Sequence, residues 1–361
     1  MTSPSIPRIF WILQPRIAGD DALLRLARHR IEQAGAGAEF YAATPEELRW
    51  LLRFRPRPAG PVIVHLPHDI NLLDADSRRL VLDFADLAAR EKIYGLVLHD
   101  HHKMSGLFSD YTGALKKLNT ALERIAGGPY LFVEYAAMLA PHFFCDLLKN
   151  VRSLEKISAC LDIGHLGIRQ LGETFRKLHR DIDVLSLTAL DPRLPGLIAD
   201  VDQAVRSVPP VTIEVVRALG SLGKPLHFHL HDGHPLSTFS RFGFADHISF
   251  FEEIPIPFLH NGKVSLPPMY GAQGLAAVVR EALRVLPADR LTFTLEIHPL
   301  PGYLHLSDVG HLFRHWHNKT NAEQMNYWLM ILLQHHNVLQ GIFAEQSERV
   351  PVSQKVERKG S

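Results

Sequence analysis

Short apolar runs alternate with longer amphipathic stretches along most of this chain. The runs are rich in β-branched and aromatic residues, and most are continuously apolar rather than alternating. Continuous runs of this kind are typical of strands that are buried on both faces. We therefore expect eight buried strands: Ile9–Gln14, Glu39–Ala42, Val62–Leu66, Tyr94–His99, Tyr130–Glu134, Ser158–Asp162, Leu226–His231 and Leu291–Glu296.

The stretches between the runs have helical periodicity. One start is marked clearly, because Thr44 offers a cap, Pro45 suits the first helical position and acidic residues follow. Strand and helix in repeated alternation indicate parallel strands joined by crossover helices. Eight such units predict an α/β fold of the (β/α)8 TIM-barrel class, with an open doubly wound sheet as the alternative. The expected helices include Asp21–Gln33, Pro45–Arg53, Asp76–Arg90, Thr112–Ile125 and Pro141–Val151.

Two segments are longer than a minimal repeat requires. Residues 166–224 separate strands six and seven, and residues 232–273 form an extended loop after strand seven. Long loops in compact domains are commonly functional, so we expect the second segment to border the substrate pocket. Its side chains either shape that pocket or pack as a small satellite core: Arg241, Phe242, Phe244, Phe250 and Phe251.

The end of the chain predicts one more helix, over Asn321–Glu345, which would close the barrel. We interpret residues 1–345 as a single barrel domain and the polar residues 346–361 as a flexible tail. No run is long enough to span a membrane, and the short apolar run near the N-terminus lacks the basic flank of a signal peptide.

Composition narrows the classes of partner. Lys and Arg number 39 against 38 Asp and Glu, so there is no basic surplus of the kind that binds nucleic-acid phosphates. The only cysteines, Cys145 and Cys160, form no disulfide framework and no cysteine-based zinc motif, which fits a cytoplasmic protein. The partner we expect is a small-molecule substrate. The oligomeric state stays open, and a homo-oligomer is compatible with the sequence.

Candidate chemistry lies where the predicted strands end. Active sites of (β/α)8 barrels gather at the carboxyl ends of the strands. Acids and histidines occupy these ends in strands three to eight: His65, His99, Glu134, Asp162, His229 and Glu296, with His165 three residues beyond Asp162. His227 and His231 flank His229, and we expect them to face away from it in supporting roles.

Converging carboxylates repel one another, and a buried unpaired carboxylate is costly. A divalent cation resolves both problems, and mixed carboxylate and imidazole ligands suit Mn, Zn, Co, Fe or Mg. Each residue alone has an ordinary alternative. Asp162, for example, is also well placed to cap the helix that follows it.

The same segments resemble the xylose-isomerase-like barrels. That superfamily includes sugar isomerases and epimerases, inosose and dehydroshikimate dehydratases, and abasic-site nucleases of the endonuclease IV type. The resemblance covers about residues 8 to 300. It is carried by VHLPHDINL (64–72), LVLH (96–99), LFVE (131–134), CLDIGH (160–165), FHLHDG (228–233), MYGAQGL (269–275) and FTLE (293–296).

The resemblance implies metal ligands at Glu134, Asp162, His229 and Glu296. It also implies that Glu134 and Glu296 act as an acid/base pair, and that His165 contacts the substrate or a second metal. His65 and His99 match the extra histidines of the multinuclear members. One departure argues against the three-metal nuclease site: SLPP (265–268) stands where the nucleases have an Asp-x-His pair, and Asp246–His247 has a different spacing. We therefore expect one or two ions.

Three hypotheses follow. The first is a metal-dependent isomerase or epimerase, or a dehydratase, that transfers a proton on a sugar, polyol or related hydroxy-carbonyl compound. The second is a multinuclear metalloenzyme, either a phosphodiesterase or an iron-dependent oxidative enzyme. The third is a binding barrel without catalysis. The chain has no G-x-S-x-G elbow, phosphate-binding loop or dinucleotide fingerprint.

Overall fold

The structure is a computed structural model that describes residues 6–13, 21–57, 60–188, 190–237, 247–297 and 321–349. Within these residues, eight parallel strands form a closed barrel in the order β1-β10-β7-β6-β5-β4-β3-β2. This confirms the predicted barrel and excludes the open doubly wound sheet. Its strands are β1 (Arg8–Leu13), β2 (Gly37–Tyr41), β3 (Val62–His65), β4 (Gly95–His99), β5 (Tyr130–Glu134), β6 (Ile157–Asp162), β7 (Leu226–Leu230) and β10 (Leu291–Leu295).

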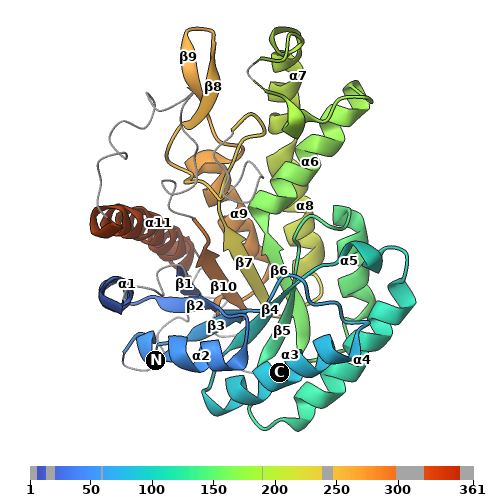
Figure 1. Ribbon diagram of the computed structural model, residues 1–361, viewed down its shortest axis with the longest axis vertical. Coiled ribbons are helices and arrows are strands. Elements are labelled where there is room, and N and C mark those ends of the chain that lie inside the picture. Colours follow the sequence, from blue (N-terminus) through green and yellow to red (C-terminus); the bar gives the residue numbers. More distant parts are fainter. Residues whose placement is uncertain are drawn as a thin grey trace.

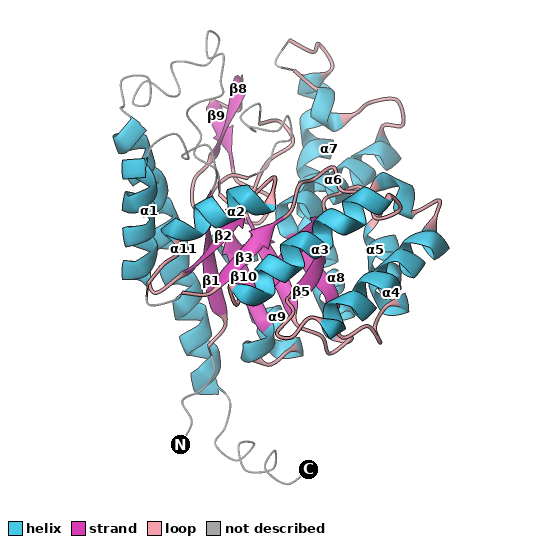
Figure 2. Cartoon of the chain, turned by 60° about the horizontal axis from the view of Figure 1, so that its bottom comes forward, coloured by secondary structure: helices cyan, strands magenta, loops and turns pink. Residues whose placement is uncertain are grey.

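Helices surround the strands (Figures 1 and 2). The helix after the second strand begins as expected, because Thr44 accepts a hydrogen bond from the backbone N–H of Glu47 and Pro45 takes the first position. The remaining predicted helices also form, with small changes of their ends. The bounds are α1 (Asp21–Ala34), α2 (Pro45–Leu51), α3 (Ala75–Arg90), α4 (Phe108–Arg124), α5 (Pro141–Asn150), α6 (Ile163–Leu178), α7 (Leu194–Arg206), α8 (Val208–Gly220), α9 (Gly271–Val285) and α11 (Asn321–Arg349).

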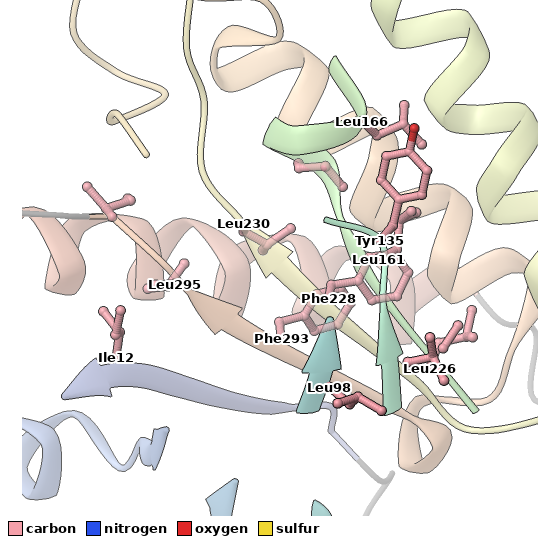
Figure 3. Close-up of a cluster of buried hydrophobic side chains, with 14 of the residues drawn as sticks. Ile12, Leu98, Tyr135, Leu161, Leu166, Leu226, Phe228, Leu230, Phe293 and Leu295 are labelled. Carbon is pink, nitrogen blue, oxygen red and sulfur yellow. The ribbon is translucent and has the colours of Figure 1, made fainter. Parts of the chain in front are cut away.

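Alternation along the strands separates two apolar layers. Outward side chains pack between strands and helices, as the stacked rings of Phe228 and Phe293 show, with centroids 5.0 Å apart (Figure 3). Inward side chains form a small separate apolar cluster inside the barrel, which we call the plug: Phe10, Ile63, Val97, Phe132 and Cys160. Beyond the plug, toward the carboxyl ends of the strands, the inward positions become polar. The acids and histidines therefore collect at those ends.

The two long segments both contain regular structure. Residues 166–224 hold most of α6 together with α7 and α8. The segment after β7 contains a two-stranded hairpin, β8 (Ile254–His260) and β9 (Lys263–Leu266), which stands beyond the barrel on the side to which β7 points (Figure 1). Its turn is Asn261–Gly262, and both residues have positive φ, which glycine and asparagine tolerate best.

The closing helix is longer than expected. α11 continues to Arg349, so the first four residues of the predicted tail are helical, while residues 350–361 lie outside the described part. The helix is anchored to the barrel, because the Trp328 indole donates to the carbonyl of Ile297 at 2.6 Å and the Trp11 indole donates to His336 Nδ1 at 3.3 Å. Among the described helices, none combines the length and apolarity needed to cross a membrane.

Candidate metal centre

Four of the predicted ligands meet at the mouth of the barrel. Glu134, Asp162 and His229 come from β5, β6 and β7, and Glu296 directly follows β10. Each offers one atom, and the four atoms lie within 4.8 Å of one another. His229 Nδ1 is central, at 2.9 Å from Glu296 Oε2, 3.4 Å from Glu134 Oε1 and 3.9 Å from Asp162 Oδ2. We call these four residues the first ligand group.

A second ligand group comprises His65, His99 and Glu134. His65 Nε2 lies 2.8 Å and His99 Nε2 lies 3.3 Å from the same oxygen, Oε2 of Glu134. His65 Nδ1 lies 2.8 Å from the carbonyl oxygen of Leu66, so this nitrogen carries a proton and Nε2 is left to face the site. The two oxygens of Glu134 thus face two different ligand groups.

His165 lies at the edge of the same cluster. Its Nδ1 is 3.4 Å from Asp162 Oδ2 and 4.0 Å from Glu134 Oε1, and its side chain keeps 15% of its surface exposed. The backbone N–H of His165 donates to Asp162 Oδ1 at 2.7 Å. Asp162 therefore caps α6 with one oxygen, as the ordinary alternative proposed, and turns the other oxygen toward the histidines.

The expectation that His227 and His231 face away from His229 was wrong. Strand residues two positions apart share a face, so all three imidazoles point into the barrel. His231 Nδ1 accepts from the backbone N–H of His247 at 2.8 Å, which leaves its proton on Nε2, 2.8 Å from Asp162 Oδ2. With both nitrogens engaged, His231 holds the side chain of Asp162 in place.

His247 also lies at the site, although it was not predicted there because Asp246–His247 lacks the spacing of the nuclease Asp-x-His pair. Its ring stacks on His231, with centroids 4.1 Å apart and planes 5° apart, and its Nε2 lies 3.5 Å from Glu296 Oε1. The long loop therefore does border the site, as expected. Asp162, His165, His231 and His247 form a third group with metal-binding spacing.

Two further residues of the site come from β2 and were not identified from the sequence. Tyr41 stacks on His65, with centroids 4.2 Å apart, and its hydroxyl donates to Glu296 Oε1 at 2.5 Å. Glu39 is fully buried one step below, where Oε1 lies 3.0 Å from His229 Nε2. The sequence feature that could have identified them is their spacing of two residues in an otherwise apolar strand, because this spacing places both side chains on the inward face.

Burial and neighbouring charges shift the titration of these groups in opposite directions. Burial would raise the pKa of Glu134 and of Glu296, but the neighbouring histidines, with His229 the foremost at Glu296, hold both pKa values well below the usual range. Burial lowers the pKa of His99 to about 3, so this imidazole is neutral and able to act as a ligand. Burial raises the pKa of Asp162 to about 8.

The residues fit divalent ions. Glu134 Oε1 and His229 Nδ1 are both buried, and neither makes a hydrogen bond of good geometry to the described residues although the atoms are only 3.4 Å apart. A divalent ion held between these two atoms would satisfy both of them. The first two groups supply carboxylates and imidazoles, a donor set that suits Mn, Zn, Co or Fe.

Of the five residues predicted to shape the pocket or form a satellite core in the long segment after β7, the structure describes two. Phe250 is buried and packs with Phe251 against His335 of α11, with ring centroids 5.8 and 4.1 Å from that imidazole. This pair matches the satellite-core alternative. The other three aromatic or basic positions, Arg241, Phe242 and Phe244, lie outside the described residues.

No family model and no curated protein matches this chain. Solved structures similar to it include a xylose isomerase domain protein from Planctomyces limnophilus, with 11% identity, a TM-score of 0.49, and coverage of 96% of this chain and 100% of that one. A D-tagatose 3-epimerase-like protein has 14% identity, a TM-score of 0.43, and coverage of 71% and 80%. A protein from Thermus thermophilus, soaked with zinc chloride, has 16% identity, a TM-score of 0.42, and coverage of 87% and 99%. The fold class rests on the closed parallel barrel itself, and the chemistry rests on the site.

Proposed function

We propose that this chain is a metal-dependent enzyme that holds two divalent ions bridged by Glu134 and transfers a proton on a small hydroxy-carbonyl substrate, as isomerases and epimerases do. The observation that carries the proposal is the placement of the two Glu134 oxygens, one toward His65 and His99 and the other toward His229.

The charge of the mouth supports bound cations. The only Lys or Arg that is buried among the described residues is Lys224, which precedes β7 at the opposite end of the barrel and donates to the carbonyl of Leu154. Among the described residues, the partners of the Glu134, Asp162 and Glu296 carboxylates are imidazoles, with the Tyr41 hydroxyl at Glu296 and the backbone N–H of His165 at Asp162. Two divalent ions would slightly exceed the charge of these carboxylates and leave the mouth suited to a substrate that becomes anionic.

Divalent ions at this position would polarise a substrate carbonyl and stabilise the charge that develops on its oxygen. The protein would supply the groups that move the proton. Glu296 is the best placed base, because the Tyr41 hydroxyl orients one of its oxygens and its pKa is held low enough to keep it ionised. His165, partly exposed at the rim, would contact the substrate and return the proton to it. Glu134 would act mainly as the bridge.

The test is exchange of solvent deuterium into ketose, aldose and polyol-derived ketone substrates, followed by proton NMR. Glu296→Gln should abolish exchange while the variant keeps its fold. Glu281→Gln is the matched control, since that carboxylate pairs with Arg217 and Arg284 on the outer helices. Glu281→Gln should exchange at the wild-type rate. Undiminished exchange in Glu296→Gln would remove this glutamate from the proton-transfer step.

The third ligand group favours a second candidate, a multinuclear phosphoesterase. Asp162 and His165 share this group with His247 and with His231, whose two nitrogens are already hydrogen-bonded to the His247 backbone and to Asp162. Hydrolysis of bis(p-nitrophenyl) phosphate by the metal-loaded protein, lost in His247→Ala, would support this candidate. Absence of hydrolysis together with deuterium exchange would support the proton-transfer function.

A further inference from the structure

The interior of the barrel, one layer below the metal centre, contains a closed hydrogen-bonded network around one carboxylate. Glu39 has no exposed surface, and neither do its partners His227, His229 and Thr294. Glu39 Oε1 lies 3.0 Å from His229 Nε2, and Oε2 lies 3.1 Å from His227 Nε2 and accepts from the Thr294 hydroxyl. A carboxylate carries a large desolvation penalty in such a place unless its oxygens are used fully.

His229 connects this network to the metal centre through its two nitrogens. Nε2 faces Glu39 in the barrel interior, while Nδ1 faces the mouth, 2.9 Å from Glu296 Oε2 and 3.4 Å from Glu134 Oε1. Glu39 can only accept hydrogen bonds, so it requires a proton on Nε2. A neutral imidazole with its proton on Nε2 presents the lone pair of Nδ1 to the centre.

The geometry points to Glu39 as a positioning residue that fixes the tautomer and ring orientation of His229, so that Nδ1 rather than Nε2 binds the ion of the first ligand group. The inference rests on the proposed metal centre and adds a residue that no strand-end motif contains. A carboxylate behind a ligating histidine also makes the imidazole a stronger ligand, and loss of such a partner commonly weakens metal affinity by about 10- to 100-fold.

His227 holds Glu39 from the opposite side. Its Nδ1 lies 2.8 Å from the Thr292 hydroxyl and its Nε2 lies 3.1 Å from Glu39 Oε2. Within the described residues, the Thr292 hydroxyl hydrogen-bonds to His227 and to the carbonyl of Leu226 but to neither Glu39 nor His229, which makes Thr292 a matched control. A change at Thr292 disturbs the same buried layer without touching the tautomer of His229.

The experiment measures zinc affinity at pH 7 by competition with a chromophoric chelator, using full-length protein. Glu39→Gln replaces one acceptor oxygen by a donor amide and should weaken the tightest zinc site by about 10- to 100-fold. Thr292→Val should lower stability but leave that affinity within about twofold of wild type. If Glu39 only stabilises the fold, both variants will lose stability and keep wild-type affinity, which would overturn the inference.

A second measurement does not depend on a variant folding. Histidine labelled with ¹⁵N in wild-type protein reports which ring nitrogen is protonated and which binds zinc. The inference requires Nε2 protonated and Nδ1 bound to zinc at His229, and zinc on Nε2 would overturn it. Wild-type protein that binds no zinc contradicts the proposed metal centre itself. Zinc binding without proton exchange contradicts only the proposed reaction.

Discussion

Gly164, the glycine of the CLDIGH motif, lies against the ring of His231. A Cβ atom built on Gly164 would be 2.0 Å from His231 Cε1 and 2.1 Å from its Nδ1. The ring cannot easily move away, because His231 Nε2 is hydrogen-bonded to Asp162 and the ring also stacks on His247. We predict that Gly164→Ala displaces His231 and with it the support of Asp162.

The cost follows from the contacts that are lost. Overpacking a buried site by a methyl group costs about 1–3 kcal/mol, and loss of the His231 hydrogen bond to a carboxylate adds about 1–3 kcal/mol. Gly172 in the same helix is the control, since its added Cβ would meet no atom within 4 Å. Gly172→Ala should stabilise the protein by about 0.5–1 kcal/mol, because glycine is unfavourable in a helix interior.

The assay is urea unfolding of both variants and wild type in EDTA, followed by circular dichroism, and then zinc titration. Gly164→Ala should shift the midpoint down at an unchanged slope and should bind zinc more weakly, whereas Gly172→Ala should shift the midpoint up and bind normally. A Gly164→Ala variant with wild-type stability and zinc affinity would refute the claim that His231 is locked between Asp162 and His247.

Three other results are expected. His335 Nε2 accepts from the Phe250 backbone and its Nδ1 lies 2.9 Å from the Ile331 carbonyl, and burial lowers its pKa to about 4. The unfolded state therefore binds more protons than the folded state between pH 6.5 and 4, so the free energy of unfolding should fall on acidification, by about 2 kcal/mol at pH 5 from this group. Denaturant unfolding at a series of pH values should show a smaller fall in His335→Gln than in wild type. Tyr41→Phe should keep zinc binding but slow deuterium exchange by about 10-fold, and an unchanged rate would exclude a role for its hydroxyl. Zinc at 100 times its dissociation constant should raise the unfolding free energy by about 2.7 kcal/mol, and EDTA should reverse this in thermal scans; zinc-independent melting would contradict a site in the native state.

The barrel could be predicted because strands that are buried on both faces appear in the sequence as continuous apolar runs. Each predicted run corresponds to a strand, and the acids and histidines that end the third to eighth runs lie at the mouth of the barrel. Glu39 and Tyr41 were not predicted because the second strand was expected to begin at Glu39, whereas β2 begins at Gly37 and Glu39 lies in its middle. Strand residues two positions apart share a face, so Glu39 and Tyr41 both point into the barrel. The same rule places His227 and His231 on the inward face with His229.

His247 could not be placed from its position along the chain. It lies in the long segment after β7 and reaches the site because the backbone of Asp232 pairs with that of Ile248. The carboxylate of Asp232 then accepts from the backbone N–H groups of Gly233, Tyr270 and Gly271, which ties the loop to the start of α9. Contacts of this kind are set by tertiary packing, and no local periodicity or motif spacing reports them.

The central claim is that Glu134 bridges two divalent ions. It is tested most directly by counting metal per chain, by mass spectrometry of the elements, in protein purified without chelators and equilibrated with zinc or manganese. Wild type should hold two ions per chain, and His65→Ala should hold one, since His65 belongs only to the second ligand group. A single ion in wild type that is unaffected by His65→Ala, or no bound ion, would contradict the bridged centre.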